Sequence, residues 1–200
     1  MSLYPQTSID ELLNLPFEQV QIITANNRLA VFIKELLIQR LQRKIMALPS
    51  ITPYKAWLDL LAQQRRFVSA DIALPLDEFA QQWLWRQAIE SVEQEHTLLS
   101  VSQAAANASQ AHRQLSEWAI DVRDDERSQE YERFIQWRAV YQEKRDALGA
   151  WDTPQILQAS LEALHDGRLR VPNHIFICGF YALSPQQKSL LMALQERGCE

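Results

Sequence analysis

The sequence predicts an α/β fold, in which a parallel sheet is combined with a large all-helical insert. Two short apolar runs, 20–24 and 175–178, are typical of buried parallel strands, and a helical pattern follows each of them. Three long amphipathic patterns lie between these runs, within residues 71–150, which contain one Pro and one Gly. Because 47% of the 200 residues are hydrophobic, the chain can bury a substantial core.

The N-terminal segment shows a helix, a strand and a second helix. Ser8 and Glu11 have the spacing of a capping box, which begins a short helix that Pro16 ends. The strand over 20–24 leads directly into a helix over 27–44, where apolar residues recur at helical spacing with basic residues on the other side. This order is the beginning of a parallel α/β sheet.

The next segment continues the α/β pattern. Residues 45–51 are apolar and can hold a second short strand. We expect Thr52 to cap a helix whose first position is Pro53, since Pro is well suited to the first turn. The apolar face of that helix carries Trp57, Leu60 and Leu61.

The middle of the chain is expected to be a helical subdomain. Its amphipathic patterns run over 77–95, 100–122 and 127–147. Trp83, Trp118 and Trp137 lie within their apolar stripes, which favours core packing over base stacking. The acidic run Asp124-Asp125-Glu126 falls at a junction between helices and fits a cap with first-turn acids better than a metal site.

The last fifty residues return to the α/β pattern. Asp152 and Gln155 have capping-box spacing and begin a helix that Gly167 ends. After the strand over 175–178, Ser184, Pro185 and Gln187 begin a final helix over 185–197. The chain stops where a βαβ pattern would start its next strand, so we expect the domain to be truncated before its last strands. The predicted parts are 1–70, the first part of the α/β domain; 71–150, the helical insert; and 151–200, the return to the α/β domain.

Charge is distributed unevenly along the chain, whose net charge is −5. Residues 1–70 hold eight Lys/Arg against five Asp/Glu, whereas residues 71–152 hold eight against sixteen. Only the first third is therefore expected to attract phosphate groups. No apolar run is long enough to span a bilayer, the N-terminus lacks a signal-peptide pattern, and two cysteines make no disulfide framework. We therefore expect a cytoplasmic protein that does not associate with membranes.

The turn after the first strand is where a phosphate-binding loop of the Walker A type would lie. Such a loop needs glycines for close backbone approach, a Lys for the phosphates and a Ser/Thr for magnesium. The turn here reads Thr24-Ala25-Asn26-Asn27-Arg28, without the glycines or the Lys. Two interpretations stay open: helix capping by Asn26 or Asn27, or nucleotide binding by an unusual loop.

The strand over 175–178 offers a second test for nucleotide hydrolysis. A Walker B strand ends with an acidic residue that holds magnesium. Here the strand is followed by Gly179 and Phe180, which can neither coordinate a metal nor activate water. Both halves of a hydrolysis site are therefore missing.

Metal-binding patterns are also missing from the sequence. The histidines lie far apart without a helical metal pair, and we expect them at the surface or at helix caps: His96, His112, His165 and His174. We therefore predict no metal, no cofactor and no catalytic residue within this chain.

Three stretches together resemble the N-terminal region of AddB-type and RecB-type DNA repair proteins, which descend from superfamily 1 helicases. These stretches are Val20–Ala30 (VQIITANNRLA), Leu48–Leu61 (LPSITPYKAWLDLL) and Asp152–Leu194, especially HIFICGFYALSPQQ. The resemblance implies a P-loop-helicase-like sheet with a helical insert, inactivated at the Walker A position (Asn26, Asn27, Arg28) and at the Walker B position (Gly179, Phe180). It also implies a PD-(D/E)XK nuclease domain beyond Glu200, if the parent protein cuts DNA.

The expected role is non-catalytic: DNA positioning or subunit scaffolding in a DNA repair or recombination nuclease. The expected partners are single-stranded or duplex-end DNA and a helicase partner subunit. The candidate DNA contacts are Arg28, Lys34, Thr52, Tyr54 and Lys55, through phosphate attraction and base stacking. Two alternatives stay open: a protein-interaction module that uses the acidic insert, and a divergent ATPase.

Overall fold

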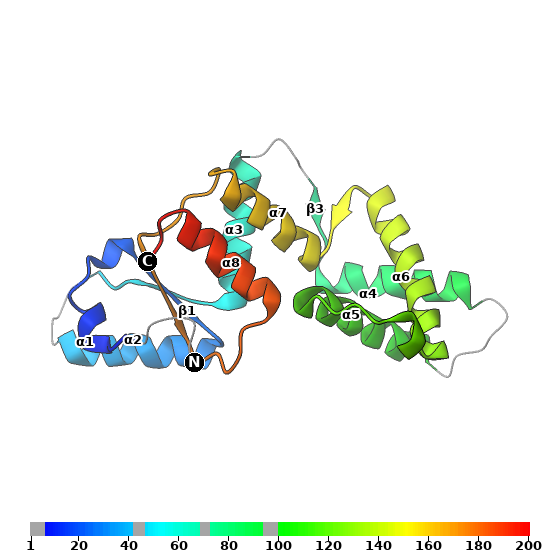
Figure 1. Ribbon diagram of the computed structural model, residues 1–200, viewed down its shortest axis with the longest axis horizontal. Coiled ribbons are helices and arrows are strands. Elements are labelled where there is room, and N and C mark those ends of the chain that lie inside the picture. The colour runs from blue at the N-terminus through cyan, green and yellow to red at the C-terminus, as the bar shows by residue number, and fades with distance from the viewer. Residues whose placement is uncertain (1–6, 42–46, 69–72, 94–99) are drawn as a thin grey trace. The chain divides into compact units, whose positions relative to one another are not determined.

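The computed structural model describes residues 7–41, 47–68, 73–93 and 100–200 (Figure 1). The chain is a mixed α/β protein that divides into two compact units. The α/β unit comprises Met1–Arg65, Ala163–Ala182 and Leu191–Glu200, and the helical unit comprises Arg66–Glu162 and Leu183–Leu190. The helical unit therefore extends past residue 150, the end that the sequence suggested, and includes a piece of the last helix.

The sheet of the α/β unit has three parallel strands in the order β2-β1-β5. β1 spans Val20–Thr24 and β5 spans His174–Cys178, which confirms the two strands expected from apolar runs. β2 spans Ser50–Pro53 and begins later than expected, while residues 45 and 46 lie outside the described part. Thr24 pairs with Pro53 on one side and Cys178 on the other, so all three strands end at one edge.

One face of this sheet is covered by the first two helices. α1 (Ile9–Leu12) begins at the expected capping box of Ser8 and Glu11, and α2 (Asn27–Leu41) follows β1. Leu12 and Leu37 from these helices pack on the β1 side chains Val20 and Ile22. Figure 1 shows α1 beside α2, where Arg40 and Asp10 form an exposed ion pair. Burial of this apolar cluster is what holds the helices to the sheet.

Three further helices are α3 (Tyr54–Val68), α7 (Thr153–His165) and α8 (Pro185–Glu196). The expected capping pairs Asp152/Gln155 and Ser184/Gln187 are both present, each with two reciprocal hydrogen bonds. The expected Thr52 cap is wrong, because Thr52 and Pro53 belong to β2 and the Thr52 hydroxyl accepts a hydrogen bond from Gln21 of the neighbouring strand.

The helical unit is built on α4 (Glu78–Val92), α5 (Val101–Trp118) and α6 (Gln129–Ala147), which confirms the three amphipathic patterns. Side chains of Asp77, Ser100 and Ser128 cap these helices. Figure 1 shows the three helices beside one another in green and yellow. Their shared core consists of Leu84, Trp85, Ala88, Ile89, Ala105, Ala108, Phe134 and Tyr141.

The tryptophan predictions are only partly correct. Trp137 packs against the core of the helical unit, but Trp83 and Trp118 are 48% and 46% exposed. Trp85, which is fully buried, occupies the core position instead and stacks on Tyr141 with ring centroids 4.2 Å apart. Trp83 and Trp85 lie two positions apart on α4, so they point in different directions from the helix.

Two small features complete the helical unit. A two-stranded parallel sheet joins β3 (Leu74–Pro75) to β4 (Ala150–Trp151), which the sequence did not suggest. The acidic run forms a short 3₁₀ helix, Asp124–Glu126, paired with Arg123 and Arg127, and is not the first turn of α6. No helix among the described residues is both long and apolar enough to cross a membrane.

Candidate functional site

The candidate site is the edge of the sheet at which the three parallel strands end. We call it the carboxyl edge and define it as residues 25–28, 54–56 and 179–182, which follow β1, β2 and β5. In open parallel sheets, ligands bind outside this edge, because the turns into the following helices meet there. The two turns at which the sequence led us to expect Walker motifs, 26–28 and 179–180, both belong to it.

The turn after β1 is closed by its own side chains. Asn26 caps α2: its side-chain oxygen accepts a hydrogen bond from the Leu29 amide at 3.0 Å. The buried Thr24 hydroxyl donates to the carbonyl oxygen of Asn26, also at 3.0 Å, which fixes the turn from inside. The Leu29 amide is one of the groups that a phosphate at this helix start would need, and Asn26 already satisfies it.

The turn after β5 packs against the same helix. Gly179 adopts a φ of +79°, and a Cβ atom at this position would overlap the side chain of Leu29. The Ala25 amide donates to the Cys178 carbonyl oxygen at 3.0 Å, which extends the β1–β5 pairing by one residue. The residue directly after β5 is therefore a glycine on which α2 packs.

An aromatic contact spans the end of β1. The ring of Phe180, after β5, meets the ring of Tyr54, after β2, edge to face with centroids 6.0 Å apart. The ring centroid of Tyr54 also lies 6.2 Å from that of the buried Trp57. Trp57 is therefore a core residue, and Tyr54 is half-buried rather than freely presented.

The structure separates the candidate DNA contacts into two groups. Arg28, Tyr54 and Lys55 lie at the carboxyl edge, and both basic side chains are exposed. Lys34 is exposed on α2, roughly 10 Å further along the helix than its first residue. Thr52 lies within β2, half-buried and bonded to Gln21. Three of the five candidates therefore share one edge.

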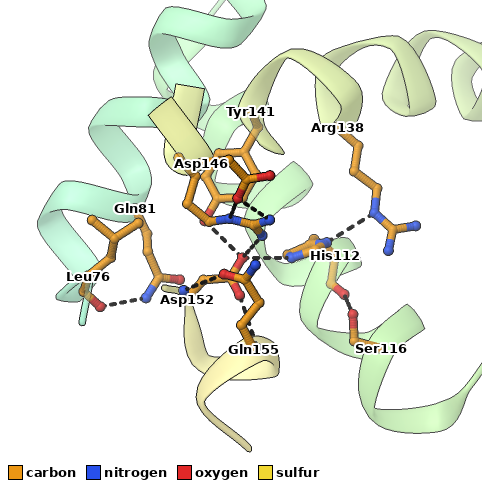
Figure 2. A network of polar contacts seen from close by, with 10 residues as sticks. Leu76, Gln81, His112, Ser116, Arg138, Tyr141, Asp146, Asp152 and Gln155 are labelled. Carbon is orange, nitrogen blue, oxygen red and sulfur yellow. Dashed lines mark hydrogen bonds and ion pairs between the residues drawn. The ribbon is translucent and has the colours of Figure 1, made fainter. Parts of the chain in front are cut away.

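A second cluster of polar side chains lies inside the helical unit (Figure 2). The buried Asp152 carboxylate is its centre: one oxygen accepts hydrogen bonds from His112 (3.0 Å), Tyr141 (3.2 Å) and Arg145 (2.9 Å). The other oxygen caps α7 through the Gln155 amide. One side chain thus joins α5, α6 and the start of α7.

The partners of His112 determine which ring nitrogen carries the proton. Arg138 can only donate, and its Nε lies 3.1 Å from His112 Nδ1, so Nδ1 is the acceptor. Nε2 then carries the proton and donates to Asp152. His112 is therefore held as a neutral imidazole between a cation and a carboxylate.

Opposing effects set the ionisation of this cluster. Burial raises the pKa of Asp152, but the hydrogen bonds from His112 and Arg145, together with the charge of Arg145, outweigh burial and lower it to about 2. Burial and the Asp152 charge raise the pKa of Tyr141, so the phenol stays a donor. The side chains of His112, Asp152 and Arg145 are 5%, 0% and 6% exposed, so we assign the cluster to stability rather than to binding.

The prediction of surface or capping histidines is wrong for His112. The spacing indicates its burial, because His112 continues a helical stripe of three small residues, Ala105, Ala108 and Ser109, all of which are buried. His165 is exposed beside Glu196, and half-buried His174 lies 3.6 Å from the Glu200 carboxylate. His96 lies outside the described residues.

Within the described ranges, no group of three or more His, Cys, Asp or Glu side chains could hold a metal ion. Burial raises the pKa of both cysteines, that of Cys199 to about 11, which disfavours their reactive thiolates.

No protein-family model and no curated protein matches the chain.

Proposed function

We propose that this chain is a non-catalytic, helicase-like domain of a DNA repair or recombination protein, and that its carboxyl edge holds DNA. The observation that carries the proposal is the closed turn at the Walker A position, where Asn26 caps α2 and Leu29 packs on Gly179. A nucleotide phosphate would have to displace both. The order of elements, with a helical unit between β2 and β5, supports the P-loop-helicase-like assignment.

Charge supports the choice of the carboxyl edge for DNA. The α/β unit carries ten Lys/Arg against eight Asp/Glu, whereas the helical unit carries ten against seventeen. The carboxyl edge itself contains Arg28 and Lys55 and no acidic residue. Phosphate groups are therefore attracted to this edge and repelled by the helical unit.

The test is fluorescence anisotropy of a labelled single-stranded oligonucleotide at several salt concentrations. We expect salt-dependent binding that the double variant Arg28→Ala, Lys55→Glu weakens. The salt slope should be smaller by about 1.4, because two phosphate contacts at about 0.7 each on a single strand are lost. Arg113→Ala with Lys188→Glu makes the same charge change on exposed residues of the helical unit and serves as the matched control. Equal loss in both variants would mean that net charge alone, and not the carboxyl edge, controls binding.

A second candidate function is favoured by the surface of the helical unit. Phe79 and Trp83 lie one turn apart on α4 and are 79% and 48% exposed, in a unit with an excess of acidic residues. Exposed aromatic side chains of this kind are common in protein interfaces. The test is capture of a protein partner after nuclease treatment, by wild type and by the Phe79→Ala, Trp83→Ala double variant. The interaction module is the better assignment if wild type captures a partner without binding DNA at low salt, and if the double variant loses the capture.

A further inference from the structure

The side chain of Tyr181 is displayed to solvent at the carboxyl edge. Its relative exposure is 107%, the highest of the exposed large hydrophobic residues, so the ring gains nothing from packing within the described chain. The backbone before it is held firmly, because Gly179 packs on Leu29 and Phe180 packs on Tyr54. An aromatic ring is therefore presented from a fixed turn rather than from a loose one.

The surroundings of Tyr181 suit a negatively charged partner with exposed rings. Arg28 and Lys55 follow the other two strands of the same edge and are exposed. The edge carries no Asp or Glu, in contrast to α4, where the exposed Phe79 stands beside Asp77 and Glu78. Cationic side chains for phosphates beside an aromatic face for bases are the two parts of a single-strand binding surface.

We infer that Tyr181 stacks on an unpaired base of single-stranded DNA held at the carboxyl edge; the inference rests on the proposed function and names a contact within it. Stacking requires a base whose face is free, which duplex DNA does not offer along its length. The contact is tolerant of sequence, because every base has a π face. Arg28 and Lys55 would supply attraction, and Tyr181 would fix where a base lies.

The experiment compares Tyr181→Ala, Tyr181→Phe and the wild-type chain with a labelled oligothymidine by fluorescence anisotropy. We expect Tyr181→Ala to weaken binding about 5- to 150-fold. The salt slope should be unchanged, because it depends on the number of phosphate contacts and the variant removes none. Tyr181→Phe keeps the ring and should bind like wild type. Phe79→Ala, which removes an exposed ring from the helical unit, is the matched control and should have no effect. An abasic oligonucleotide should remove the difference between wild type and Tyr181→Ala.

The outcomes separate this inference from the proposed function. If wild type binds and the Arg28/Lys55 variant lowers the salt slope, but Tyr181→Ala binds like wild type, the stacking inference is wrong and the proposed function stands. If Tyr181→Ala lowers the salt slope as well, the residue does not act by stacking. If wild type does not bind at all, both fail. Thermal melting of both Tyr181 variants should match wild type, because the Tyr181 ring buries no surface.

Discussion

Asp152 shows how much of the helical unit depends on one side chain. Its carboxylate compensates the buried guanidinium of Arg145 and accepts hydrogen bonds from His112 and Tyr141, while its second oxygen caps α7. Removing one partner of a buried ion pair costs far more than the pair itself contributes, because the other charge stays buried.

We predict that Asp152→Asn lowers the free energy of unfolding by about 3–5 kcal/mol. The neutral amide cannot balance Arg145, whose side chain is 6% exposed. Asp146→Asn is the control: Asp146 also pairs with Arg145, at 2.8 Å, but its side chain is 60% exposed, so we expect a loss of about 1 kcal/mol or less. Urea unfolding of the three proteins measures both values, and similar losses would contradict the central role of Asp152.

The same residue predicts a stability change in acid. The pKa of Asp152 lies at about 2 in the folded chain against an ordinary value of 3.8, so its ionised form stabilises the fold. A lowered pKa gives stability that is fully present above the unfolded value and is lost as the pH falls through the folded value. We expect roughly 2 kcal/mol to disappear between about pH 4 and pH 2, at 1.36 kcal/mol per unit. The difference in stability between wild type and Asp152→Asn should shrink over this range; a difference independent of pH would exclude this linkage.

At the scale of elements, the sequence predicted what depends on local chemistry. The strands β1 and β5, the three helices of the helical unit and the capping boxes of α1, α7 and α8 all follow from periodicity and cap residues within a few positions. Thr52 was misjudged because its hydroxyl bonds across the sheet to Gln21, a partner 31 residues away. The pair β3–β4 was missed because two-residue strands have no measurable periodicity.

The candidate site shows the same difference between features set by neighbouring residues and features set by distant ones. That the turns at Asn26 and at Gly179 lack the glycines and Lys of a Walker A loop and the carboxylate of a Walker B strand could be read from the residues alone. That Leu29 packs on Gly179, that Phe180 contacts Tyr54 and that Tyr181 is fully exposed could not, because each depends on how separate turns meet at the carboxyl edge.

The packing of α2 on the turn after β5 gives a prediction at this scale. Gly179→Ala should lower stability by more than Gly198→Ala, although both glycines have a left-handed φ, +79° and +81°. At Gly198 a Cβ atom meets nothing within 4 Å, so that variant shows only the backbone cost of about 1–2 kcal/mol. The excess cost at Gly179 measures the overlap with Leu29 and should fall in the Gly179→Ala, Leu29→Ala double variant relative to the sum of the single variants. Equal losses at the two glycines would mean that the turn moves freely away from α2.

At the scale of the whole molecule, the two structural units also differ in their charge. The α/β unit carries the basic excess and the carboxyl edge, and the helical unit carries the acidic excess and the exposed aromatic residues of α4. The two proposed interactions, with DNA and with a protein, therefore belong to different units. Variants confined to one unit can test each interaction without altering the other.

We predict that magnesium and ATP leave the melting temperature of the chain unchanged. A ligand present at a hundred times its Kd stabilises a protein by about 2.7 kcal/mol, which for a chain of this size would raise Tm by roughly 5–10 °C. A nucleotide phosphate at this turn would have to displace the Asn26 side chain from the Leu29 amide, which it caps. Differential scanning fluorimetry with and without magnesium-ATP makes the comparison, and a magnesium-dependent rise of several degrees would favour the divergent ATPase instead.

The two oxygens of Asp152 also have a consequence for local unfolding. The carboxylate that caps the first turn of α7 is the one that neutralises the interior of the helical unit, so this turn cannot fray without exposing Arg145 and His112. Helix ends usually exchange their amide hydrogens first, through opening motions that cost little. The start of α7 can open only together with α5 and α6. We therefore expect its amide hydrogens to exchange as slowly as those in the core of the helical unit.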